Sequence, residues 1–227
     1  MASTAACPRQ DPRAKLSRDQ VIQAAHEILL REGLEGLNMR RLATALGVTA
    51  MTLYTYVRSK DELLDAVVDR VVSHELDLGG FAGSWRADLG ELMRRIYAML
   101  VANPFIVRVR LRRPLASPRQ LQVNEAGVRI LMQGGFDARE AARAYRSLLV
   151  VTFGFAAFGP PEDSRDQENA VRAALAGLSA DDYPYLTRAA AETVETHAPG
   201  PALFEYTLER ALEGLERAAR GRGSGRP

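Results

Sequence analysis

Cysteine, histidine and long apolar runs are scarce in this 227-residue chain. With Cys7 as its single cysteine, the chain can form neither an internal disulfide nor a cysteine-rich metal site. The three histidines, His26, His74 and His197, are not spaced to bind one metal ion together. No apolar stretch approaches membrane-spanning length, and the N-terminus lacks the hydrophobic segment of a secretory signal. The sequence therefore predicts a soluble cytoplasmic protein with no membrane association, metal or other cofactor.

Motifs of common enzyme classes are also missing. The chain has no glycine-rich phosphate loop before Lys-Ser or Lys-Thr and no Gly-x-Ser-x-Gly elbow. His26-Glu27 begins like the metal-binding helix of a zinc protease, but Leu30 stands where the second histidine is required. We therefore predict no catalytic residues and no enzymatic activity.

The net charge of +2 hides an uneven distribution. Residues 1–60 carry nine Lys or Arg against five Asp or Glu, and the last eleven residues carry four Arg and no acidic residue. The remaining stretch, 61–216, therefore has a net charge of −6. A basic N-terminal segment favours a module that binds phosphate groups. The acidic remainder of the chain is then expected to form a separate module with a different function.

Apolar residues recur at helical spacing along most of the chain, and strand patterns are nearly absent. The stretch Val107–Arg112 alternates apolar and basic residues, but a single strand would have no partner here, so we predict helix or turn. The polar segment Pro160–Asn169 is predicted to be a loop, and the loop 77–84 is predicted to separate two modules. The fold class is all-α. Outside the segment from Asn38 to Lys60, helices bounded by caps, prolines and glycines are expected near 17–33, 60–72, 85–103, 118–132, 137–158 and 201–220.

The most informative segment is Asn38 to Lys60, NMRRLATALGVTAMTLYTYVRSK. Asn38 and Thr49 are suited to cap two short helices, and Gly47 can adopt the positive φ of a tight turn between them. The residues expected to face inward are Leu42, Ala43, Leu46, Val48, Leu53 and Val57. Those left to face outward are Ala50, Met51, Thr52, Tyr54, Thr55 and Tyr56. This is the pattern of a helix-turn-helix, whose second helix enters the DNA major groove.

Purely structural interpretations of this segment also remain open. It could be an ordinary helical hairpin that Gly47 merely turns, although the caps and the charge distribution favour the helix-turn-helix. Tyr54 and Tyr56 could be half-buried packing residues, a role compatible with contacting DNA. Lys60 lies in the first turn of the next helix, beside free N–H groups, where it can help to bind a phosphate.

The segment resembles the tetracycline-repressor (TetR) family of transcriptional regulators over roughly residues 17–72. A weaker likeness, at Arg113-Pro114 and from Gly135 to Tyr145, extends to the regulatory domain of the tetracycline-repressor branch itself. The N-terminal resemblance rests on Leu42-Ala43, Leu46-Gly47-Val48, Thr52-Leu53-Tyr54, Tyr56-Val57, Lys60 and Leu63-Leu64-Asp65-Ala66.

The resemblance implies an all-helical homodimer with a small-molecule effector site in each subunit. The helices Asp137–Phe158 and Pro201–Arg220 of both subunits would form a four-helix bundle, and effector binding would move the DNA-binding domains apart. The expected domains are a disordered N-terminal arm (1–15), a helix-turn-helix DNA-binding domain (16–76), a C-terminal regulatory and dimerisation domain (77–220) and a disordered basic tail (221–227).

Matching positions in the family motif imply roles for individual residues. Arg40 corresponds to a base-reading residue, suited to guanine through its bidentate guanidinium, whereas the neighbouring Arg41 is interpreted as a solvated charge. Ala50 and Met51 match base-edge positions, where apolar side chains can touch a thymine methyl or exclude a wrong base, and Thr55 can also reach a base. The matched phosphate contacts, which set register without reading sequence, are Thr52, Tyr54, Tyr56 and Lys60.

The effector site departs from the tetracycline-repressor pattern. That repressor holds a magnesium–drug chelate through a histidine shortly before its Arg-Pro step, and here Phe105–Arg112 contains no histidine. An effector other than a tetracycline–magnesium complex is therefore expected, with Arg108 or Arg110 as candidate anchors for an acidic group. Core packing for the aromatic residues and an ion-paired or solvated face for the arginines remain simpler alternatives. The candidate aromatic pocket walls are Tyr97, Phe105, Phe153, Phe155 and Phe158.

Together these patterns predict a ligand-responsive transcriptional repressor. It would bind a near-palindromic double-stranded DNA operator as a homodimer and be released by a small-molecule effector. Two alternatives stay open: an effector-independent DNA-binding or architectural protein, and a small-molecule carrier that has lost DNA binding. The sequence does not identify the effector, the operator or the regulated gene.

Overall fold

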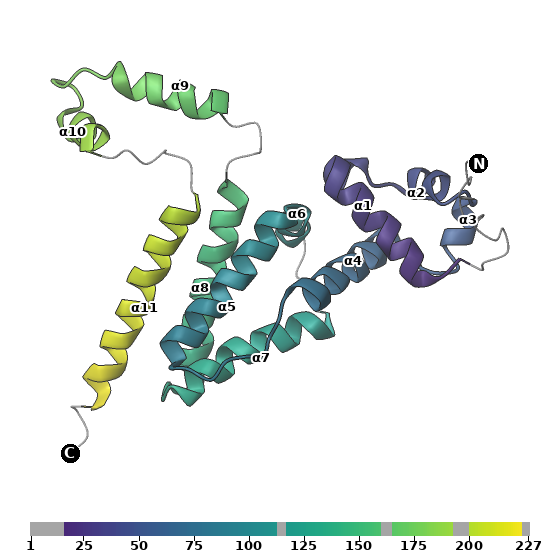
Figure 1. Ribbon diagram of the computed structural model, residues 1–227, viewed down its shortest axis with the longest axis horizontal. Coiled ribbons are helices and arrows are strands. Elements are labelled where there is room, and N and C mark those ends of the chain that lie inside the picture. The colour runs from purple at the N-terminus through teal and green to yellow at the C-terminus, as the bar shows by residue number, and fades with distance from the viewer. Residues whose placement is uncertain (1–15, 113–116, 160–164, 193–199, 224–227) are drawn as a thin grey trace, which may run out of the picture. The chain divides into compact units, whose positions relative to one another are not determined.

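A computed structural model describes residues 16–112, 117–159, 165–192 and 200–223. In these ranges the chain is helical without any strand, which confirms the predicted all-α class (Figure 1). None of the described helices is long and apolar enough to cross a membrane. The helices are α1 (Arg18–Gly36), α2 (Met39–Ala45), α3 (Ala50–Leu53), α4 (Lys60–Glu75), α5 (Trp85–Ala102), α6 (Phe105–Arg112), α7 (Pro118–Gln133), α8 (Ala138–Phe158), α9 (Arg165–Ala176), α10 (Pro184–Glu192) and α11 (Pro201–Gly223).

The chain divides into two compact units between Val67 and Val68, inside α4. The irregular segment 77–84 follows α4, as predicted, but the division lies upstream of it. Residues 1–15, predicted to be an arm, and the Arg113-Pro114 step lie outside the described residues.

The first unit consists of α1, α2, α3 and the first half of α4. The predicted capping box opens α1: Ser17 Oγ accepts the Gln20 N–H at 3.1 Å, and Gln20 Oε1 accepts the Ser17 N–H at 2.8 Å. Gly33 interrupts α1 with a φ of 67°, close to the predicted end of this helix. The apolar core of the unit includes Val21, Ile22, Ala25, Ile28, Leu29, Leu34, Leu37, Leu42, Leu53, Val57 and Leu63, all buried.

In the second unit, α8 packs against both α5 and α7 (Figure 1). Helix α7 lies tightly against α8 at Gly127, where an added Cβ would overlap the ring of Tyr145. Tyr145 is buried, and its hydroxyl group lies 3.4 Å from the Val123 carbonyl oxygen and 3.2 Å from Asn124 Oδ1. A glycine at 127 therefore allows these two helices to approach closely.

Helix α11 packs on α5 and α8 through an apolar stripe. Its Phe204, Leu208 and Leu212 side chains are buried, one helical turn apart. The Phe204 ring stacks on Tyr97 of α5 with 4.1 Å between ring centroids, and Phe155 of α8 meets it edge-on at 5.6 Å. These aromatic contacts join three helices.

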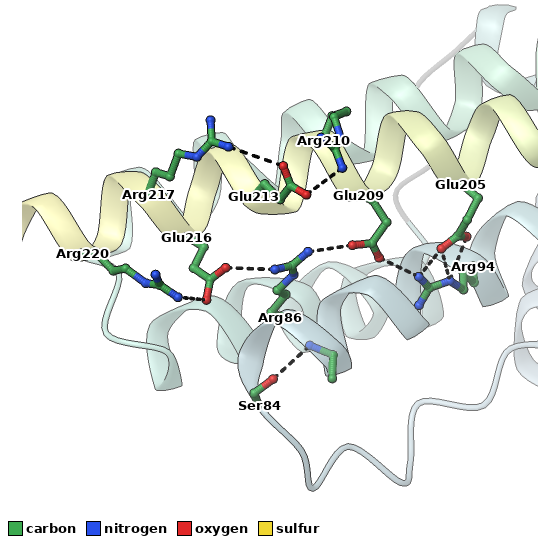
Figure 2. A network of polar contacts seen from close by, with 11 residues as sticks. Ser84, Arg86, Arg94, Glu205, Glu209, Arg210, Glu213, Glu216, Arg217 and Arg220 are labelled. Atoms are coloured by element: carbon green, nitrogen blue, oxygen red, sulfur yellow. Dashed lines mark hydrogen bonds and ion pairs between the residues drawn. The ribbon is translucent and has the colours of Figure 1, made fainter.

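A row of ion pairs runs beside this stripe (Figure 2). Arg94 bridges Glu205 and Glu209 of α11, and Arg86 bridges Glu209 at 2.7 Å and Glu216 at 2.9 Å. The hydrogen bond from Arg94 holds the pKa of Glu205 below its ordinary value. Because all five side chains are partly exposed, each pair adds little stability alone. Their sharing of Glu209 favours one register of α11 along α5.

Three sequence expectations differ from the structure. The predicted loop at 160–169 is wrong for residues 165–169, which lie in α9. Arg, Gln and Glu favour helix despite their polarity, so polarity alone was a poor indicator there. Helix α10 was not predicted, and α11 continues to Gly223, into the predicted tail 221–227. By contrast, the segment Val107–Arg112 is helical in α6, consistent with the predicted helix or turn.

The close packing at Gly127 leads to a prediction. Gly127→Ala should destabilise the protein by about 1–3 kcal/mol, because the new methyl group must displace the Tyr145 ring in a packed interface. Gly214→Ala in α11 is the matched control: nothing lies within 4 Å of the added Cβ, so the change should stabilise by about 0.5–1 kcal/mol. Urea unfolding followed by circular dichroism measures both, and equal midpoints for the two variants would contradict the packing argument.

Candidate nucleic-acid interface and effector cavity

The helix-turn-helix is built from local capping bonds. Asn38 Oδ1 accepts the Arg41 N–H at 2.9 Å and starts α2. Thr49 Oγ1 accepts the Thr52 N–H at 3.2 Å and starts α3. Between them Gly47 has a φ of 65°, the left-handed conformation expected for the turn. All three predicted local features are confirmed.

The two faces of the second helix are separated as predicted. Leu53 and Val57 are buried. Met51 is 77% exposed and Tyr54 48% exposed, with Thr55 also exposed. The helix is shorter than expected, because α3 ends at Leu53 and the chain continues through a turn. Half-buried positions in this segment are Leu46, Val48, Ala50, Thr52 and Tyr56.

The two neighbouring arginines of α2 differ in their partners. Arg41 forms an ion pair with Glu32 of α1, so its charge is already engaged. Arg40 is exposed and forms no ion pair with any described residue. A free guanidinium on α2, the helix in contact with α3, can bind two acceptors of a guanine edge or a phosphate.

A polar cluster, formed by the Arg18 and Glu62 side chains with the backbone of Tyr56 and Arg58, fixes the end of the helix-turn-helix and is called the Arg18 brace below. Arg18 Nε donates to the Tyr56 carbonyl at 3.3 Å, and Arg18 Nη2 lies 3.5 Å from Glu62. Glu62 Oε2 accepts the Arg58 N–H at 2.8 Å, and this bond is the main reason that the pKa of Glu62 is lowered. A capping box at Ser59 is half formed: Ser59 Oγ accepts the Glu62 N–H at 3.1 Å, but the Glu62 carboxylate accepts the Arg58 N–H.

The sequence did not predict the contact of Arg18 with Tyr56. Arg18 lies 38 positions before Tyr56, and no local pattern connects them. The bonds hold the backbone that leads from α3 into the first turn of α4, where Lys60 is half-buried. Free N–H groups and the positive end of the helix dipole at this turn favour an anion.

The second unit contains a cavity of about 230 Å³, lined by residues of α6, α7 and α8. Its apolar wall includes Val128, Leu149 and Phe153. An almost closed void of about 10 Å³ shares Leu149 and Phe153 with it. The polar lining consists of Arg110, Gln120, Asn124, Tyr145 and Arg146.

Two of the predicted pocket residues line this cavity, namely Phe153 and Arg110. Phe105 is 2% exposed and belongs to the core. Arg108 is exposed and lies outside the lining of the cavity. Phe158 is 75% exposed at the end of α8.

Tyr97 and Phe155 both pack on Phe204. The simpler alternative of core packing describes the buried Tyr97, whereas Phe155 is half-buried. The polar lining residues Gln120 and Asn124 were missed. They recur one helical turn apart on α7, a spacing that could have marked one polar stripe. Tyr145 and Arg146 gave no separate signal, because α8 reads as an apolar helix along most of its length.

The brace predicts a pH dependence. Since the folded-state pKa of Glu62 lies below its ordinary value of 4.5, its ionised form stabilises the fold above that pH, and this contribution is lost as pH falls through the folded-state pKa. Glu62→Gln should therefore melt below the unmodified protein at neutral pH, with the gap closing in acid. Differential scanning fluorimetry checks this. Glu125→Gln, at an exposed position of α7, is the control; a gap that persists in acid would contradict a charge effect.

Comparisons with known proteins agree with this architecture. Residues 21–67 match the family described as "Bacterial regulatory proteins, tetR family", and residues 81–219 match "Tetracyclin repressor-like, C-terminal domain". The chain is 31% identical to the HTH-type transcriptional repressor DrrR1 of Streptomyces coeruleorubidus, over 97% of this chain and 85% of that protein. It is also 31% identical to the class C tetracycline repressor protein of Escherichia coli, over 89% and 92% of the two chains.

Solved structures show the same likeness. The Streptomyces coelicolor TetR family protein ActR, crystallised in complex with actinorhodin, is 28% identical. It superposes with a TM-score of 0.78, covering 91% of this chain and 99% of ActR. Both units thus match one family of regulators in sequence, and the whole chain matches it in fold. The chain belongs to the TetR family of bacterial transcriptional regulators.

Proposed function

We propose that this protein is a homodimeric repressor that binds a near-palindromic operator and releases it when a small molecule occupies the cavity of the second unit. The observation that carries the proposal is the capped α3, whose Met51, Tyr54 and Thr55 side chains are exposed, together with the exposed, unpaired Arg40 of the neighbouring α2. ActR, a similar protein, has been crystallised with actinorhodin, which supports an effector-responsive mechanism.

The exposed and half-buried side chains of this segment are assigned to two kinds of DNA contact. Met51, largely exposed and apolar, suits the methyl group of thymine, and Arg40 suits guanine. The base-reading set is Arg40, Ala50, Met51 and Thr55. The phosphate-binding set is Thr52, Tyr54, Tyr56 and Lys60, which fixes register without reading sequence.

An apolar face on α8 and α11 supports dimerisation. A surface depression of about 300 Å³ is lined by Val151, Gly154, Phe155, Phe158 and Thr207. Exposed apolar surface of this kind usually marks an interface. A second copy of the same face would cover it, and two copies related by a twofold axis would present their α3 helices to half-sites about 34–36 Å apart.

The last turns of α4 are bonded to α7, which supports a route from the cavity to the DNA-binding residues. Ser117 caps α7 and donates to Asp69 Oδ1 at 2.6 Å. Arg119 Nη2 donates to the Leu76 carbonyl at 2.9 Å. Because Gln120 of the same turn lines the cavity, an effector that shifts the start of α7 also shifts its bonds to α4.

The contact assignment predicts different effects for two variants. Arg40→Ala should cost about 1–3 kcal/mol of discrimination and relax specificity at one base pair. Lys60→Ala should weaken all sequences evenly and reduce the log–log salt slope by about 0.9. Fluorescence anisotropy at several salt concentrations, on operators found by genomic footprinting, measures both. Arg31→Ala, at an exposed position of α1, is the control. Unchanged operator binding in both test variants would refute the assignment.

The dimer assignment is tested separately. Val151→Glu places a charge in the apolar face, so the variant should be monomeric and lose operator binding. Met132→Glu introduces the same charge at an exposed apolar residue of α7 and should remain dimeric. Light scattering after gel filtration gives the masses. A Val151→Glu protein of dimer mass would place the subunit contact elsewhere.

A further inference from the structure

The cavity of the second unit is cationic. Two arginines, Arg110 of α6 and Arg146 of α8, lie among its lining residues, and none of the described lining residues carries a carboxylate. Neither arginine forms an ion pair with a described residue. By contrast, Arg86 and Arg94 of the same unit are each paired with two glutamates. The positive charge in the cavity is therefore available to a ligand.

The neighbouring polar groups do not neutralise this charge. The Tyr145 hydroxyl hydrogen bonds to Asn124 and to the Val123 carbonyl, and burial raises the pKa of Tyr145. Its phenol therefore stays protonated and supplies no negative charge. Gln120 and Asn124 are neutral amides. An anion is the ligand charge that best complements this lining.

The apolar wall limits the rest of the ligand. Leu149 and Phe153 provide an apolar and aromatic surface beside Tyr145 and Arg146 on the same side of α8. The volume of about 230 Å³ is below the roughly 300–1,000 Å³ of common ligand sites, which favours a compact molecule. Arginine binds carboxylates through two parallel hydrogen bonds, whereas aromatic faces favour stacking with flat rings.

We propose that the effector is a compact, flat aromatic carboxylate, whose acid group is bound by Arg110 and Arg146 and whose ring system lies against Leu149 and Phe153. The proposal rests on the proposed function of this cavity as the effector site. It selects Arg110 over Arg108, the other arginine that the sequence offered as an anchor, because only Arg110 lines the cavity.

The test compares acids with their neutral amides on the full chain. The probes are 2-naphthoate with 2-naphthamide and anthracene-2-carboxylate with its carboxamide, measured by isothermal titration calorimetry. At least one acid should bind about tenfold or more tighter than its amide, as hydrogen bonds to charged groups are the stronger ones. Equal affinities in both pairs, or no binding of either acid, would overturn the proposal.

Variants then locate the charge effect. Arg110→Gln and Arg146→Gln should each reduce the preference for the acid over the amide. Arg108→Gln is the control: Arg108 also belongs to α6 but is exposed and does not line the cavity, so this variant should keep the preference. Melting temperatures show whether each variant folds. The acid–amide comparison on the unmodified chain does not depend on the variants. A preference that survives both cavity variants overturns the assignment.

Operator release is measured in parallel by anisotropy, so that the two proposals can fail separately. Tight binding of an acid without operator release supports the ligand class and contradicts effector-controlled repression. Release by the amides alone supports repression and contradicts the ligand class. Release by the acid at concentrations that match its binding supports both.

Discussion

The close approach of α7 and α8 at Gly127 determines the geometry of the cavity. Because no side chain separates the helices there, the Tyr145 ring lies against the α7 backbone and its hydroxyl reaches Asn124. That contact sets the distance between Asn124 and the next turn of α8, where Arg146 and Leu149 line the cavity. The spacing of the polar and apolar lining residues therefore depends on the absence of a Cβ at position 127.

The DNA-binding unit depends on a different kind of interaction. Its turn and helix starts are set by hydrogen bonds between residues three or four positions apart, at Asn38, Thr49 and Ser59. Such bonds require little long-range packing. The Arg18 brace and the Arg41–Glu32 ion pair connect residues that are farther apart, and the brace fixes the backbone at Tyr56. The outer surface of α3 is thus presented by a mainly local design.

This difference explains how far the sequence could predict the protein. Caps and the Gly47 turn involve neighbours in sequence, so the all-α fold and the surface of α3 were predictable from residue type and spacing. The cavity lining combines side chains of α6, α7 and α8, and no spacing rule connects them. For the same reason the sequence could not distinguish aromatic residues of the cavity from those of the core: Phe153 lines the cavity, whereas Tyr97 packs on Phe204.

Helix α8 serves two surfaces at once. At about 100° per residue, the cavity-lining positions 145, 146, 149 and 153 centre on one side of the helix, and positions 151, 154, 155 and 158 centre on the opposite side. A substitution that alters the first set leaves the second untouched. Under the proposed function, drift in one stripe of α8 can change the chemical signal without altering the stripe assigned to subunit pairing.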